Sequence, residues 1–133
     1  MWEREGCDIL KGKKILAVDD CPQLRDLISS IFSAAGAEVI TAADGEEGVS
    51  MALMKKPDLI TMDNNMPKMS GADACKVLKT SIGTKKVPIL MVSSDYPIFK
   101  VLFEEKLIDD YLPKPFMFPD LLGKAVKVLE DRG

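Results

Sequence analysis

The feature that most constrains the fold is an alternation of short apolar runs with longer segments of helical spacing. Four apolar runs stand out and a weaker fifth follows them: residues 14–18, 38–42, 58–62, 87–92 and 110–113. Each run is bounded by charged or turn-forming residues, and its apolar residues are continuous rather than alternating with polar ones. This pattern is typical of strands that are buried on both faces, as in a parallel sheet.

The intervals between the runs have the spacing of amphipathic helices. In the first interval, Pro22 suits a first helical turn and Gly36 suits the end of the helix. Its apolar side chains recur at i, i+3, i+4 and i+7: Leu24, Leu27, Ile28 and Ile31. Further helices are predicted over residues 44–56, 70–83, 97–106 and 117–133. The alternation predicts one α/β domain, a doubly wound (βα)5 fold with a five-stranded parallel sheet and helices on both faces.

Composition narrows the class of protein. The 133 residues carry a formal net charge of −3, so there is no basic excess of the kind that binds nucleic acid. No apolar run approaches the roughly 20 residues of a membrane span. The chain has no histidine, which excludes histidine catalysis and histidine metal ligands. Three scattered cysteines, Cys7, Cys21 and Cys75, fit a reducing cytoplasm better than a disulfide framework.

Polar residues follow four of the predicted strands at their carboxyl ends. The first strand ends in Asp19 and Asp20, the third in Asp63, the fourth in Ser93, and the fifth runs into Lys114. Taken singly, each has an ordinary explanation as a helix cap, a turn hydroxyl or a surface charge. Ligands of open α/β sheets bind outside the carboxyl ends of the strands. The convergence of these residues therefore predicts a site at that edge.

The electrostatics of such a site call for cations. Two carboxylates 4 Å apart repel by about 4 kcal/mol at an effective dielectric of about 20. Lys114 supplies one positive charge, and an all-oxygen cluster suits Mg²⁺, which takes one or two protein carboxylates together with phosphate oxygens. Asp63 is then a candidate nucleophile, because aspartyl phosphate formation is an established carboxylate role. Mg²⁺, Lys114 and the Ser93 hydroxyl would bind the oxygens of the phosphoryl group.

Four motifs carry a family resemblance over about residues 13–131. They are "ILAVDD", "PDLITMDNNMPKMSG", "VPILMVSS" and "DYLPKPF", in this order. The sequence resembles the receiver domain of bacterial two-component response regulators, especially the stand-alone kind represented by the chemotaxis response regulator. The resemblance implies a flavodoxin-like sheet with strand order 2-1-3-4-5.

The resemblance also implies a role for each site residue. Asp63 would be the phosphoacceptor, and Mg²⁺ would be bound by Asp19, Asp20, Asp63 and the main-chain carbonyl of Asn65. Ser93 and Tyr111 occupy the two switch positions, and Lys114 is the lysine of the active site. The bond between Lys114 and Pro115 is expected to be cis.

Two further positions are expected to tune dephosphorylation. Asn65 lies two residues after the phosphoacceptor, and Asp95 lies two residues after the switch serine. In the chemotaxis regulator an amide and a carboxylate at these places favour attack by water. The alternative for Asp95 is that it helps to cap the helix that begins near Pro97.

The sequence departs from the family before the fifth strand. Leu107 and Ile108 replace the usual Gly-Ala turn, which leaves the course of residues 95–109 open. Ile98, Val101 and Leu102 are expected to cover the sheet. Phe99 and Phe103 are then predicted to be partly exposed beside Tyr111, where they would contact a partner or a second copy of the chain. The alternative is that the helix sinks deeper and buries Phe99.

The resulting hypothesis is a phosphorylation-controlled binding module in the cytoplasm. A sensor histidine kinase or phosphotransfer protein would donate to Asp63, and output would pass to a downstream protein, with no direct nucleic-acid or membrane binding. The chain would catalyse only its own phosphorylation and dephosphorylation. One rival hypothesis is an aspartate-nucleophile phosphatase, but the position of its general acid is occupied here by Asn65, which cannot donate a proton as an acid. The other is a flavin-binding protein of the same strand pattern, but no Ser/Thr/Gly-rich phosphate loop follows the first predicted strand. Residues 1–12 match no motif and are predicted to be a flexible extension of the receiver domain at 13–133.

Overall fold

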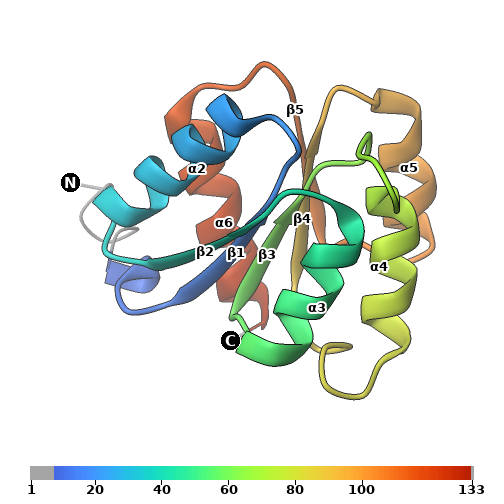
Figure 1. Ribbon diagram of the computed structural model, residues 1–133. Coiled ribbons are helices and arrows are strands. Elements are labelled where there is room, and N and C mark those ends of the chain that lie inside the picture. The colour runs from blue at the N-terminus through green and yellow to red at the C-terminus, as the bar shows by residue number, and fades with distance from the viewer. Residues whose placement is uncertain (1–7, 133) are drawn as a thin grey trace.

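The computed structural model describes residues 8–132, and its centre is a five-stranded parallel sheet (Figure 1). The strand order is β2-β1-β3-β4-β5, as predicted. The strands are β1 (Lys14–Val18), β2 (Glu38–Ala42), β3 (Leu59–Met62), β4 (Ile89–Ser93) and β5 (Asp110–Pro113). Every residue of β3 and β4 is buried, which agrees with the continuous apolar runs that predicted strands covered on both faces.

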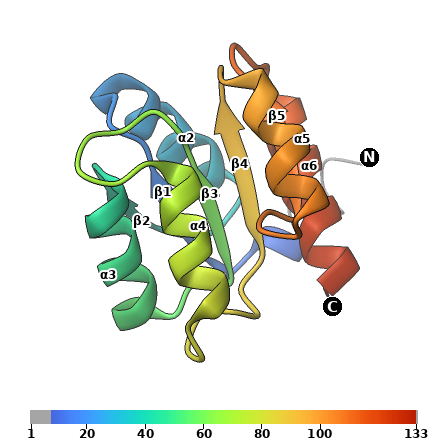
Figure 2. The same cartoon turned by 90° about the vertical axis from the view of Figure 1, so that its right-hand side faces the viewer.

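Helices cover both faces of the sheet. They are α2 (Pro22–Ala34), α3 (Gly45–Lys55), α4 (Gly71–Thr80), α5 (Tyr96–Glu104) and α6 (Phe118–Arg132). One face is packed by α2 and α6 and the other by α3, α4 and α5, which lie in a row in Figure 2. Each face has its own apolar core, so the sheet separates two hydrophobic layers. In the part of the chain that the structure describes, no helix has the length and apolarity that crossing a membrane requires.

Local sequence signals fix the helix ends. Gly36 follows Ala35, the C-cap of α2, and adopts the left-handed conformation (φ +93°) that ends the helix, as predicted. Asp44 caps α3 by accepting a hydrogen bond from the Glu47 N–H at 2.8 Å. Ser70 caps α4 in the same way, through the Asp73 N–H at 3.1 Å.

The described part of the predicted flexible extension is packed against the fold. Residues 8–10 form a helical turn, and Leu10 is fully buried in the core beneath α2 and α6. The Gly12 N–H donates to the Gly36 carbonyl at 2.9 Å, which fixes the turn to the end of α2. The prediction of flexibility was therefore wrong for residues 8–12. Residues 1–7 lie outside the described residues.

The buried face of α5 also differs from the prediction. Phe99 is only 4% exposed, whereas Val101 is 48% exposed. The ring of Phe99 stacks on Tyr111 of β5, with 4.8 Å between ring centroids, and this large contact draws Phe99 rather than Val101 onto the sheet. The predicted exposure of Phe99 was wrong. Phe103 is 47% exposed, as expected.

The unusual segment after α5 forms a regular helix end. Lys106 adopts the left-handed conformation (φ +62°) that glycine usually takes at this position. The Leu107 N–H donates to the Leu102 carbonyl at 2.9 Å and the Lys106 N–H to the Phe103 carbonyl at 3.1 Å, which is the Schellman pattern. Ile108 is then buried in the core. An apolar residue thus anchors the chain where the family turn is missing.

Candidate functional site at the carboxyl edge of the sheet

Backbone pairing places the candidate side chains along one edge of the sheet. The Asp63 N–H donates to the Val18 carbonyl at 3.0 Å, so Asp63 lies next to the end of β1, where Asp19 and Asp20 follow. On the other side, the Lys114 N–H donates to the Ser93 carbonyl at 3.0 Å. Backbone hydrogen bonding between neighbouring strands therefore continues one residue past the ends of β3 and β5. It brings the residues that end β1, β3, β4 and β5 together at the carboxyl edge of the sheet.

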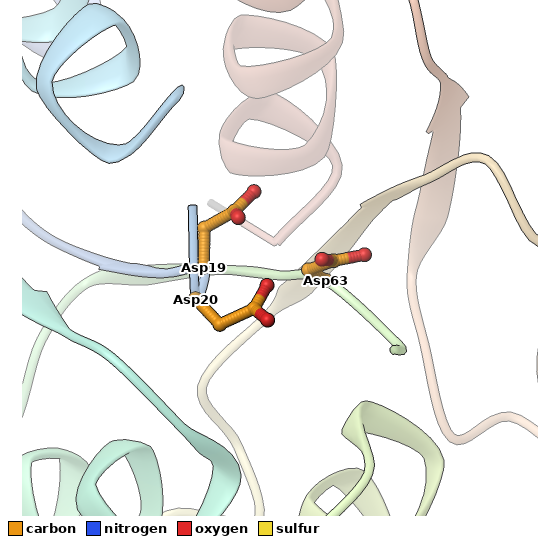
Figure 3. A group of neighbouring side chains, drawn as sticks. All are labelled: Asp19, Asp20 and Asp63. Atoms are coloured by element: carbon orange, nitrogen blue, oxygen red, sulfur yellow. The ribbon is translucent and has the colours of Figure 1, made fainter. Parts of the chain in front are cut away.

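Three carboxylates form the centre of the site (Figure 3). Oxygen atoms of Asp19, Asp20 and Asp63 all lie within 4.8 Å of one another. Asp19 and Asp63 are 1% and 6% exposed, whereas Asp20 is exposed to solvent. The cluster thus has two buried charges and one open side, at the edge of the sheet where the sequence predicted a site.

Lys114 bridges the two buried carboxylates. Its Nζ lies 2.8 Å from Asp19 Oδ2 and 3.4 Å from Asp63 Oδ2. Burial lowers the pKa of Lys114, but the hydrogen bond and charge of Asp19, followed by those of Asp63, outweigh it and raise that pKa above its usual value. The lysine is therefore charged at neutral pH and offsets part of the repulsion between the two carboxylates. The bond between Lys114 and Pro115 is cis, as expected.

Burial raises the pKa of Asp63 above its usual value, and the negative charge of Asp19 adds to this effect. The charge of Lys114 acts in the opposite direction. So do hydrogen bonding by the Ser93 hydroxyl and the Asn64 main-chain N–H, which donates to Asp63 Oδ1 at 2.7 Å. Ser93 is fully buried beside the carboxylate, at the place predicted for the switch serine.

Two residues that hold Asp19 were not predicted from the sequence. The Cys21 main-chain N–H donates to Asp19 Oδ1 at 2.9 Å. The Arg25 guanidinium donates to the Asp19 main-chain carbonyl at 2.8 Å. Arg25 lies in the first turn of α2, a few residues after Asp19 and Asp20. This short spacing is the sequence feature from which its contact with Asp19 could have been predicted.

Gly71 is required because α4 begins directly against the backbone that follows β3, at Asp63 and Asn64. A Cβ atom on Gly71 would collide with the Asp63 carbonyl oxygen, and it would lie 2.8 Å from the Asn64 Cα. Only glycine permits this approach of two backbones. The turn after β3 can therefore fold back tightly and leave the Asp63 side chain at the edge of the sheet.

The donor set of the cluster fits Mg²⁺. All three side chains offer hard oxygen ligands, and the exposed side of Asp20 leaves positions for water and phosphate oxygens. Among the described residues, no main-chain N–H donates a hydrogen bond to the main-chain carbonyl of Asn65, so this oxygen is available as a further ligand. The Asn65 side chain is exposed to solvent.

The aromatic switch candidate lies on a different part of the sheet from the carboxylates. Tyr111 is partly buried and packs against Phe99, and its ring contacts Phe103 edge-on at 5.9 Å between centroids. Lys124 Nζ lies 5.6 Å from its ring centroid. Tyr111 therefore belongs to a layer around α5 and β5 and not to the cluster itself.

Asp95 occupies the N-cap position of α5, but its side chain does not cap the helix. Its Oδ2 instead accepts a hydrogen bond from Asn64 Nδ2 at 2.7 Å. The capping alternative is thus excluded. Asn64 was not singled out in the sequence, although it stands directly after Asp63.

Comparison with known proteins decides the family. The family model described as "Response regulator receiver domain" matches residues 15–126. The chain belongs to the response regulator receiver domain family. Receiver domains of this family are signalling domains of two-component systems.

Two curated relatives illustrate the range of the family. The chain is 43% identical over 119 residues to the alkaline phosphatase synthesis transcriptional regulatory protein PhoP of Bacillus subtilis, covering 89% of this chain and 48% of PhoP. It is 31% identical over 118 residues to protein PilG of Pseudomonas aeruginosa, covering 87% of this chain and 86% of PilG. The chain thus spans about half the length of PhoP but most of the length of PilG.

Solved structures have the same fold. The Vibrio cholerae chemotaxis protein CheY4 superposes with a TM-score of 0.81 at 35% identity, covering 88% of this chain and 98% of CheY4. The receiver domain of the Pseudomonas aeruginosa sensor histidine kinase PA1611 has a TM-score of 0.79 at 26% identity, covering 90% and 98%. That structure has a magnesium ion coordinated in its active-site cleft.

Proposed function

We propose that this receiver domain is a switch that is phosphorylated on Asp63 in the presence of Mg²⁺. The observation that carries the proposal is the bridging of Asp19 and Asp63 by Lys114, 2.8 and 3.4 Å away, beside the exposed Asp20. This arrangement holds the Asp63 carboxylate next to one fixed positive charge and beside a second, solvent-exposed carboxylate. The magnesium-containing PA1611 receiver domain supports the metal assignment.

In the proposed reaction, a carboxylate oxygen of Asp63 attacks the phosphorus of a phosphohistidine in a sensor histidine kinase or phosphotransfer protein. The phosphorus–nitrogen bond breaks, and the histidine of the donor takes up a proton. Lys114 and the Ser93 hydroxyl bind oxygens of the transferred group, because transfer concentrates negative charge there. Asp19, Asp20, Asp63 and the Asn65 main-chain carbonyl would hold Mg²⁺, which when bound would neutralise part of that charge.

Phosphorylation is proposed to shift a conformational equilibrium that involves Ser93 and Tyr111. A phosphoryl group on Asp63 would draw the buried Ser93 hydroxyl toward it. The packing of Tyr111 against Phe99 and Phe103 of α5 would then change. The change alters the affinity for a downstream protein by population shift. Asp95 and Asn65 are proposed to set the lifetime of this state by favouring attack of water.

The partner surface is proposed to lie around Phe103 and Tyr111. Phe103 is half exposed and contacts Tyr111 edge-on, so this surface is in direct contact with the proposed switch residue. Phe99 is excluded from it because it is buried. A downstream protein or a second copy of the chain would bind here, in the cytoplasm and without contact to nucleic acid by these residues.

The test is phosphorylation by acetyl phosphate with Mg²⁺, followed by intact-mass analysis. The wild type should gain one phosphoryl group, and Asp63→Asn should gain none. The matched control is Asp58→Asn, an aspartate at the opposite end of β3, which should be phosphorylated normally. Modification of Asp63→Asn would refute the assignment of the nucleophile, and hydrolysis of p-nitrophenyl phosphate would favour the phosphatase hypothesis.

A further inference from the structure

The loop between β4 and α5 is attached to the phosphoacceptor loop by a side-chain hydrogen bond that the proposed chemistry does not require. Asn64 Nδ2 donates to Asp95 Oδ2 at 2.7 Å, and the two residues are 31 positions apart in the sequence. Asn64 is buried, and Asp95 is partly exposed. A bond between an amide and a carboxylate at this distance is a strong, charge-assisted one.

Asn64 is itself held at several points. Its main-chain N–H donates to Asp63 Oδ1 at 2.7 Å, and its side-chain Oδ1 accepts from the Ala72 N–H at 2.9 Å. Its main-chain carbonyl accepts from the Gly71 N–H at 2.9 Å. The amide that faces Asp95 is therefore a rigid donor, fixed by the start of α4 on one side and by the phosphoacceptor on the other.

Only one of the two carboxylate oxygens of Asp95 is bonded to Asn64. Oδ2 is engaged by Asn64, and the Asp95 main-chain N–H donates to the Ser93 hydroxyl oxygen at 3.1 Å. Among the described residues, Oδ1 has no hydrogen-bond donor and remains free to accept one from water. The two contacts give the Asp95 carboxylate a defined orientation next to Asn64, the residue that follows Asp63, and tie its backbone to Ser93.

We propose that Asn64 is a positioning residue for hydrolysis of phosphorylated Asp63, acting through Asp95. The inference rests on the proposed function of Asp63. In the step concerned, a water molecule oriented by Asp95 Oδ1 forms a bond to phosphorus while the bond from phosphorus to the Asp63 oxygen breaks. Asp63 regains its carboxylate, and inorganic phosphate leaves with the protons of the water. Without Asn64, the Asp95 side chain turns freely and the water loses its fixed acceptor.

A double-mutant cycle on the half-life of phosphorylated Asp63 tests this role. The protein is phosphorylated with acetyl phosphate, the donor is removed by rapid desalting, and decay is followed by intact mass with Mg²⁺ present. Asp95→Ala and Asn64→Ala should each lengthen the half-life several-fold. The double variant should decay no more slowly than the single ones, because Asn64 acts only through Asp95.

The control is Ser70→Ala, which removes the cap of α4 without touching Asp95. Its half-life should equal that of the wild type, whereas a role of Asn64 in holding α4 would make Ser70→Ala behave like Asn64→Ala. If Asn64→Ala does not fold, Asn64→Asp replaces it in the cycle, since it keeps the acceptor for the Ala72 N–H and loses the donor to Asp95.

The outcomes separate the two proposals. Effects of Asn64 and Asp95 that multiply in the double variant would overturn the positioning role, as would an unchanged half-life in Asn64→Ala, while Asp63 would remain the phosphoacceptor. A wild-type protein that gains no phosphoryl group would overturn the proposed function and this inference with it.

Discussion

Replacing Lys114 by methionine removes the positive charge between two buried carboxylates while keeping a side chain of similar length. At an effective dielectric of about 20, the Coulomb attraction of Lys114 is about 6 kcal/mol to Asp19 at 2.8 Å and about 5 kcal/mol to Asp63 at 3.4 Å. Dehydration of the ammonium group offsets much of this attraction. Removal of one partner from a buried ion pair costs about 3–5 kcal/mol, and that is the expected loss in the free energy of unfolding at neutral pH without Mg²⁺.

The loss should depend on pH in a definite direction. Burial already raises the pKa of Asp63 in the folded protein, and Lys114 lowers it, so the variant has a still higher folded pKa for Asp63. The unfolded chain has an ordinary value of about 3.9. Because the folded state then holds its proton to higher pH than the unfolded state, stability falls as pH rises from the unfolded pKa through the folded pKa. The difference between variant and wild type should therefore be smallest near pH 4 and largest at neutral pH.

The assay is urea unfolding followed by circular dichroism at several pH values, with and without Mg²⁺. Lys68→Met is the matched control, since Lys68 is 63% exposed and its nitrogen lies 3.7 Å from Asp44. That variant should lose no more than about 1 kcal/mol at any pH. A loss below about 1 kcal/mol in Lys114→Met, or a loss equal at low and neutral pH, would refute the reasoning that Lys114 offsets the carboxylate charge.

Three further predictions concern the same edge of the sheet. Mg²⁺ at a hundredfold excess over its Kd should raise the unfolding free energy of the wild type by about 2.7 kcal/mol, and Asp20→Asn should be more stable than wild type without metal and respond less to it; thermal melts with and without Mg²⁺ measure both. Gly71→Ala should lose about 1–3 kcal/mol or more in urea unfolding, because the added Cβ collides with the Asp63 carbonyl and forces the backbone to move; wild-type stability would mean that the start of α4 can shift freely. Tyr96→Phe should lower the free energy of unfolding by about 0.5–1.5 kcal/mol and should be phosphorylated by acetyl phosphate more slowly. The reason is that the Tyr96 hydroxyl donates to the Lys114 carbonyl at 2.8 Å and so fixes the backbone that presents the Lys114 side chain. An unchanged phosphorylation rate would show that this hydrogen bond contributes to stability alone.

The fold and the central cluster could be predicted because they follow from short-range patterns. Continuous apolar runs identify buried strands, and parallel strands carry their carboxyl ends to one edge, so the amino-acid sequence alone places Asp19, Asp20, Asp63, Ser93 and Lys114 together. The likeness of the motifs to a known family then supplied the strand order. The roles of these residues stay predictions until phosphorylation is measured.

The residues whose burial was predicted wrongly are those whose exposure depends on tertiary contacts. Helical periodicity carries no information about such contacts. Within α2, Leu27 fits the apolar spacing but is 48% exposed, while Phe32 is fully buried. In α5, the helical periodicity predicted that Val101 is buried and Phe99 partly exposed, whereas the structure shows the reverse. Phe99 is buried because it stacks on Tyr111, which lies on a different element, the strand β5. Asn64 escaped notice for the same reason, since its partner Asp95 belongs to another loop.

The buried Leu10 has a consequence for joining this domain to other proteins. The family match begins at residue 15, which suggests a natural junction for a chimera. A fusion made there would remove a fully buried side chain from the layer beneath α2 and α6 and leave a void. Emptying such a site costs about 2–5 kcal/mol, a large part of the stability of a small domain. A fusion whose junction lies before residue 8 keeps Leu10 and so keeps this part of the core filled.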